Sequence, residues 1–75
     1  MDDLQYTARC WRASGRILAA SARLEEKFGL DPRLLDELDE KTSVFVRDPQ
    51  DVAARADFAV ALAGFLAATL EEVID

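Results

Sequence analysis

Apolar residues recur along the chain at the three- and four-residue spacing of amphipathic α-helices, in three segments. Two Asp-Pro pairs, Asp31-Pro32 and Asp48-Pro49, separate these segments. Aspartate is a favoured N-cap because its carboxylate accepts from free backbone N–H groups, and proline suits the first helical position because it lacks an N–H. Each pair therefore predicts the start of a helix.

The predicted helices cover residues 2–28, 32–46 and 49–74. Gly29 follows the first of them, and glycine is the usual residue for the left-handed conformation that ends a helix. The sequence thus predicts an all-α fold for a single domain over residues 1–75, a small bundle of two long helices and one short.

The middle helix is the least certain of the three. Its apolar positions have helical spacing: Leu34, Leu35, Leu38, Thr42 and Phe45. The stretch TSVFV, however, has the β-branched character of a strand. We favour a helix to Val46, and the alternative ends the helix near Lys41 with residues 42–47 extended.

Both long helices carry two apolar ridges at 100° per residue. In the first helix a seam holds Leu4, Ala8, Trp11, Gly15, Leu18 and Ala22, and a second ridge holds Cys10, Ile17, Leu24 and Phe28. In the last helix a seam holds Val52, Ala56, Ala59, Ala63, Leu66, Leu70 and Val73, and a second ridge holds Phe58, Leu62 and Phe65. Two ridges require two packing partners, which is the situation of each helix in a three-helix bundle. The uncharged residues 58–70 are therefore predicted to be mainly core.

The short chain predicts self-association. A domain of 75 residues buries only about 60% of its unfolded surface, so its core is marginal. One cysteine closes no internal disulfide, and the absence of histidine removes the commonest zinc ligand. We expect a homo-oligomer because of the unequal helix lengths. The last helix would outrun the shorter middle helix, so that its residues from Phe65 onward project past the bundle, and Leu4, Ala8 and Trp11 would be uncovered at the other end. The predicted interface residues are Leu4, Trp11, Phe58, Leu62, Phe65, Leu66, Leu70, Val73 and Ile74.

Charge is unevenly distributed. The chain has fifteen acidic and nine basic residues, a net charge of −6, which makes general attraction to nucleic acid or anionic lipid unfavourable. The first helix nevertheless carries a basic stripe: Arg9, Arg12, Arg16 and Arg23, with Lys27. We interpret this stripe as a partner-binding or acid-paired face, with Asp36, Asp39 and Glu40 as internal candidates. A nucleic-acid-associated regulator that uses these arginines is an alternative.

Paired carboxylates suggest a second alternative. Glu37 with Glu40, and Glu72 with Asp75, lie three residues apart on helix faces. This pattern resembles the acidic helix motifs of the all-α nucleotide pyrophosphohydrolases, a resemblance that implies Mg²⁺ binding and hydrolysis of a nucleotide phosphate. Acidic pairs of this spacing are also usual on solvated helix faces, which is the interpretation we favour.

No other motif indicates catalysis. Cys10 has no histidine to act as its base, so a structural thiol is expected, and the serines and threonines likewise lack a triad partner. The N-terminal MDDLQYTARCW has no apolar signal region, and the uncharged stretch is too short to span a bilayer. We therefore expect a cytoplasmic, noncatalytic helical interaction or assembly module without metal or cofactor.

Overall fold

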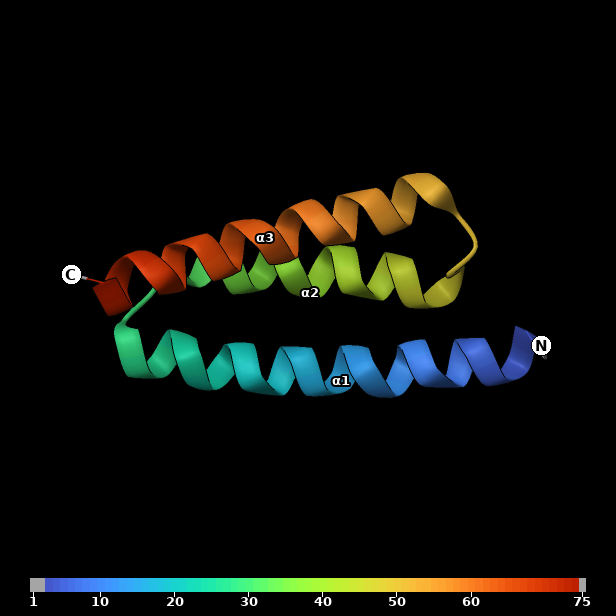
Figure 1. Cartoon of the computed structure of the whole chain (residues 1–75), viewed down its shortest axis with the longest axis horizontal. Helices are drawn as coiled ribbons and strands as arrows, with labels where there is room; N and C mark the ends of the chain where they lie inside the picture. Colours follow the sequence, from blue (N-terminus) through green and yellow to red (C-terminus); the bar gives the residue numbers. More distant parts are fainter. Residues whose placement is uncertain (1–2, 75) are drawn as a thin grey trace.

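Three α-helices form an elongated antiparallel bundle in the computed structural model, which describes residues 3–74 and the side chains of residues 5–74 (Figure 1). They are α1 (Asp3–Phe28), α2 (Pro32–Arg47) and α3 (Val52–Ile74). No strand occurs between residues 3 and 74. The predicted all-α bundle is confirmed, and the extended alternative for residues 42–47 is wrong.

The connection between α1 and α2 follows the local sequence. Gly29 has a φ of 64°, the left-handed conformation that a side chain would oppose, and the Leu30 N–H donates to the Glu25 carbonyl at 3.1 Å. Asp31 caps α2 by accepting from the Arg33 N–H at 3.0 Å, and Pro32 takes the first helical position. The predicted end of the first helix and the predicted start of the second are confirmed.

The connection between α2 and α3 differs from the prediction that a helix starts at Pro49. The helix begins at Val52, because Asp51 is the residue that caps it: its Oδ1 accepts from the N–H groups of Ala53 at 3.0 Å and Ala54 at 3.3 Å. Asp48 instead closes the turn, where its carbonyl accepts from the Asp51 N–H at 3.0 Å. Reversal of the chain thus uses residues 48–51 before the new helix begins.

The core lies where α2 faces the other two helices. Leu38 of α2 and Phe65 of α3 are fully buried and form a cluster with Leu30. The five predicted inward positions of α2 are all buried or half-buried. Around the cluster pack Ile17, Leu18, Leu24, Phe28, Leu34, Leu35, Phe58, Ala61 and Leu62. Contact is most extensive between α2 and α3 and least extensive between α1 and α3.

Each long helix was predicted to bury two ridges, and the structure confirms the second ridge of each while the seams are largely exposed. In α3 the ridge with Phe58, Leu62 and Phe65 faces the core, and every residue of the seam that runs from Val52 to Val73 is exposed. In α1 the ridge with Ile17, Leu24 and Phe28 packs against the core, and Leu18 is the half-buried residue of a seam whose other described members are exposed. In α1 the buried stripe centres on Ser14 and Ser21, between the two predicted ridges, with Ser14 and Ser21 themselves buried. The aromatic rings of α3 remove more apolar surface from water than its alanines do, which favours the observed orientation.

The predicted projection of the C-terminal end is also wrong. Phe65 was expected to lie beyond the bundle, yet its side chain is 0% exposed. The C-terminal end of α3 lies level with the C-terminal end of α1, whereas the N-terminal end of α1 extends past the turn between α2 and α3 (Figure 1). The residues of the two connections add no length along the bundle axis. A given residue of α3 therefore lies closer to the N-terminal end of its helix than a continuous rise of 1.5 Å per residue from Pro49 predicts, and it projects less far.

Candidate functional site

The outer face of α3 is apolar along its whole length. On the side of α3 away from the core, at 100° per residue, the exposed residues include an extended nonpolar set with the charged Glu71 at its margin. We call this set the α3 outer face: Val52, Ala56, Ala59, Val60, Ala63, Leu66, Ala67, Leu70 and Ile74. Val60 is 73% exposed, Leu66 45% and Leu70 56%. A helix that is apolar on its solvent side as well as its core side has a surface suited to a second packing partner.

The spacing within this face is that of a coiled coil. From Val52 to Val73 the seam residues are separated alternately by four and three positions. This is the heptad pattern by which one helix packs against another along a shared axis. Within the bundle α2 packs on the opposite, phenylalanine-bearing side of α3, so the heptad seam has no partner in the described part of the chain.

The structure divides the predicted interface residues between three locations. Phe65 is buried in the core, and Phe58 and Leu62 are half-buried against it, so these three are core residues of the single chain. Leu66, Leu70, Val73 and Ile74 are exposed on α3. Val60 was missed because it lies beside the heptad seam and not in it. The side chain of Leu4 lies outside the described residues.

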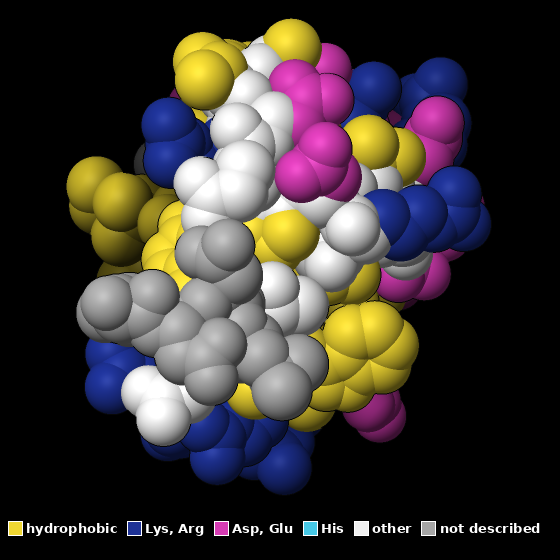
Figure 2. Space-filling view, turned by 90° about the vertical axis from the view of Figure 1, so that its right-hand side faces the viewer, with side chains coloured by type: hydrophobic (Ala, Val, Ile, Leu, Met, Phe, Trp, Pro, Cys, Tyr) yellow, Lys and Arg dark blue, Asp and Glu magenta, His cyan; other side chains and the backbone are white. Residues whose placement is uncertain are grey.

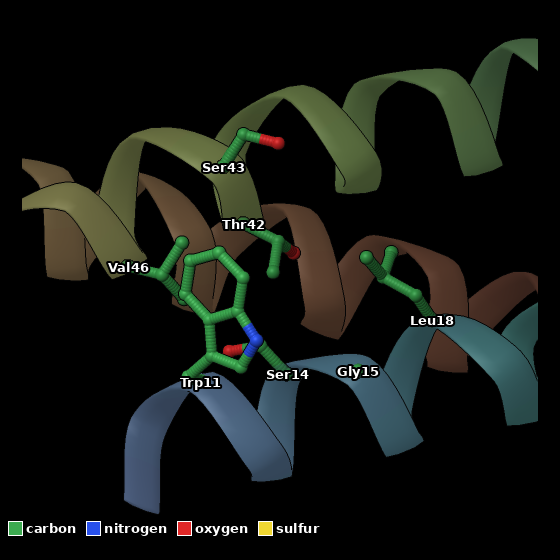
Figure 3. Close-up of a pocket in the computed structure, with 7 residues that line it drawn as sticks. All are labelled: Trp11, Ser14, Gly15, Leu18, Thr42, Ser43 and Val46. Carbon is green, nitrogen blue, oxygen red and sulfur yellow. The ribbon is translucent and has the colours of Figure 1, made fainter. Parts of the chain in front are cut away.

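Trp11 lies apart from the α3 outer face, beside a groove between α1 and α2. Its indole is 67% exposed, so it is not a core residue. The groove has a volume of about 220 Å³ and is lined by Trp11, Ser14, Gly15, Leu18, Thr42, Ser43 and Val46 (Figure 3). Two of its hydroxyls are already bonded within α2, since Thr42 donates to the Leu38 carbonyl at 2.6 Å and Ser43 to the Asp39 carbonyl at 2.9 Å.

The basic stripe is exposed on α1. Arg9, Arg12, Arg16 and Arg23 are all solvent-exposed, and Figure 2 shows Lys and Arg side chains along the lower edge of the molecule, which α1 forms. The expected pairing with Asp36, Asp39 or Glu40 of α2 does not occur. Between side chains of residues 5–74 the ion pair is Arg33 with Asp31, at 2.8 Å. The α1 arginines therefore face solvent without an acidic partner from the described part of the chain.

The acidic pairs stay on the surface. Glu37, Glu40 and Glu72 are exposed, and Asp75 lies outside the described residues. Across residues 3–74, no three or more Cys, Asp or Glu side chains gather as a metal site would require. Cys10 is a half-buried free thiol. Glu25 has one carboxylate oxygen, Oε2, that is buried and accepts no hydrogen bond from the residues that the structure describes.

Comparison with known proteins finds no matching family model, no similar curated protein and no similar solved structure. Among the described residues, no helix has the length and apolar character needed to cross a bilayer. The surfaces of the bundle itself therefore carry the functional argument, and the α3 outer face is an apolar surface with several large exposed side chains.

Proposed function

We propose that the protein is a noncatalytic helical assembly module that acts as a homo-oligomer through the α3 outer face. The observation that supports this proposal is the exposure of a continuous heptad seam, together with Val60, on a helix whose other side already packs in the core. Heptad seams are stabilised by a second helix with the same repeat, and every copy of this chain carries one.

The exposed area of the chain supports a partner of standard size. Its accessible surface is 5377 Å². A folded monomer of 8.3 kDa has about 4,600 Å² by the usual scaling with mass, so this chain exposes about 800 Å² more. A standard protein–protein interface buries about 800 Å² on each partner. The excess surface of this elongated chain is thus similar to the area that each partner buries in a standard interface, which is compatible with pairing along α3.

The energetics favour the same conclusion. Full burial of a leucine or valine side chain contributes about 1.5–3 kcal/mol relative to full exposure. The four large aliphatic residues Val60, Leu66, Leu70 and Ile74 are each between 45% and 81% exposed. Covering them would add several kcal/mol to a domain whose total stability is typically about 5–15 kcal/mol.

Size-exclusion chromatography with light scattering tests the proposal. We expect a dimer or larger oligomer at tens of micromolar protein, and Leu70→Glu should convert it to a smaller species because a carboxylate would then be buried without a partner. Gln50→Glu is the matched control, since it adds the same charge in the exposed turn before α3. A folded wild-type monomer, with helical circular dichroism and the mass of one chain, would contradict the proposal.

The rival enzymatic function has its own assay. Incubation with Mg²⁺ or Mn²⁺ and a panel of nucleoside triphosphates should give no turnover, because Glu37 and Glu40 are solvated and are not part of a group of three or more acidic or cysteine side chains among the described residues. Turnover that is lost in Glu37→Gln or Glu40→Gln would replace the noncatalytic proposal with a metal-dependent phosphohydrolase.

A further inference from the structure

Side-chain size varies along the heptad seam of α3. The seam begins with Val52, continues with alanines at positions 56, 59 and 63, and ends with Leu66, Leu70 and Val73. The three larger residues are all exposed, with Leu70 at 56% and Val73 at 58%. The seam is therefore shallow between residues 56 and 63 and bulky between residues 66 and 73, which constrains how two copies can pack.

We propose that α3 pairs with α3 of a second copy in antiparallel orientation, an inference that rests on the proposed assembly function. In this orientation Ala63 lies opposite the second copy's Leu66, Ala59 opposite its Leu70 and Ala56 opposite its Val73. Each layer then combines one small and one large side chain, so the helices keep a constant separation and the layers fill to normal packing density. A twofold axis relates the two copies and repeats each layer.

Parallel pairing would fill the seam unevenly. Leucines would meet leucines toward the C-terminal end, and alanines would meet alanines in the three layers between Val52 and Leu66. The separation of the helices that accommodates the leucine layers would leave gaps between the alanines, and such gaps forfeit dispersion contacts and burial. The antiparallel register avoids both the leucine–leucine layers and the gaps between alanines, because each layer combines a large residue with a small one.

Charge at the helix ends favours the same orientation. Glu71 and Glu72 lie in the last turn of α3, which contains no basic residue, and a helix C-terminus carries a partial negative charge of its own. Parallel pairing would gather these carboxylates from both copies at one end. Antiparallel pairing places them at opposite ends of a helix about 34 Å long, at 1.5 Å per residue over 23 residues.

Disulfide trapping between differently tagged chains tests the orientation. In a Cys10→Ser background, which removes the native thiol, Ala59→Cys chains are mixed with Leu70→Cys chains, re-equilibrated and oxidised. Antiparallel pairing predicts that more than one half of the disulfide-linked dimers contain one chain of each variant, whereas random linkage gives one half. The reason is that residue 59 of one copy lies in the same layer as residue 70 of the other, while two copies of residue 59, or of residue 70, lie in different layers. Asp57→Cys, exposed on the flank of α3 outside the seam, is the control and should crosslink to neither variant.

The possible results separate the orientation from the assembly itself. Self-linked Ala59→Cys and Leu70→Cys dimers, without the mixed species, would show parallel pairing and overturn the inference while leaving the assembly proposal intact. An oligomer by light scattering in which neither position crosslinks would overturn pairing through this seam. A folded monomer that forms no crosslinks would overturn both proposals.

Discussion

The rings of Phe45 in α2 and Phe58 in α3 stack with their centroids 5.0 Å apart and an interplanar angle of 5°. Phe45 is buried and Phe58 is half-buried. The pair joins the two helices beside the turn at residues 48–51, and Phe58 belongs to the same stripe of α3 as Phe65. This contact therefore helps to set which side of α3 faces the core and which side remains available to a partner.

Truncation of Phe45 should destabilise the bundle severely. Replacing a buried phenylalanine with alanine costs about 3–5 kcal/mol, which is comparable with the total stability of a small domain. We expect Phe45→Ala to lower the urea midpoint, followed by circular dichroism, or to prevent folding. Val44→Ala is the control, because Val44 is adjacent but exposed. Equal midpoints for the two variants would contradict the assigned role of the aromatic pair.

The location of the α3 cap can be tested with two aspartates. Loss of an N-cap carboxylate costs about 0.5–2 kcal/mol. Asp51→Ala should therefore lower the melting temperature by several degrees, since about 1 kcal/mol corresponds to about 4–8 °C in a domain of this size. Asp48→Ala should lower it less, because its side chain makes a single 3.3 Å bond to the Gln50 N–H in the turn. The reverse order in thermal melts would support the helix start predicted at Pro49.

Acid should remove the stabilising contribution of the Asp31–Arg33 pair. The Arg33 guanidinium donates to both carboxylate oxygens of Asp31, and these side-chain bonds, with the backbone N–H of Arg33, hold the pKa of Asp31 below its ordinary value of 3.8. Because the folded pKa is the lower one, the contribution is fully present above pH 3.8 and is lost as the pH falls through the folded pKa.

The comparison variant for this pair is Asp31→Asn, which keeps a capping oxygen but has no charge. Wild type should be more stable than Asp31→Asn at neutral pH, and the difference should shrink below pH 3.8 in denaturation series at several pH values. In an Arg33→Gln background the pH dependence of this difference should be smaller. A difference that stays constant from pH 7 to pH 2 would show that the ion pair does not contribute.

The basic stripe of α1 should not bind duplex DNA. The arginines are exposed, but the chain has a net charge of −6, which opposes approach to a polyanion. We expect no micromolar binding by fluorescence anisotropy at low or moderate salt. Micromolar binding that weakens steeply with salt and is lost in Arg12→Glu with Arg16→Glu would favour the nucleic-acid alternative. The control is the double variant Arg33→Glu with Arg47→Glu, which makes the same charge change on α2. If the α1 stripe binds DNA, this control should still bind it.

Several features of the fold are determined by the local sequence. The end of α1 at Gly29 and the start of α2 at Asp31-Pro32 were both predicted correctly, because capping hydrogen bonds and left-handed backbone conformation involve only neighbouring residues. The inward face of α2 was also predicted correctly, since one side of that helix is apolar and the other is charged. A single apolar stripe leaves no choice of orientation.

Only the tertiary structure decided which sides of α1 and α3 are buried. Both helices have more than one apolar ridge, so periodicity admits several orientations, and the choice depends on contacts with residues far away in the sequence. In α3 the contacts of Phe58 with Phe45 and the burial of Phe65 beside Leu38 turn the phenylalanine ridge inward and the heptad seam outward. The sequence predicted two apolar ridges on α3, and tertiary packing determined that the alanine and leucine seam is the one left exposed.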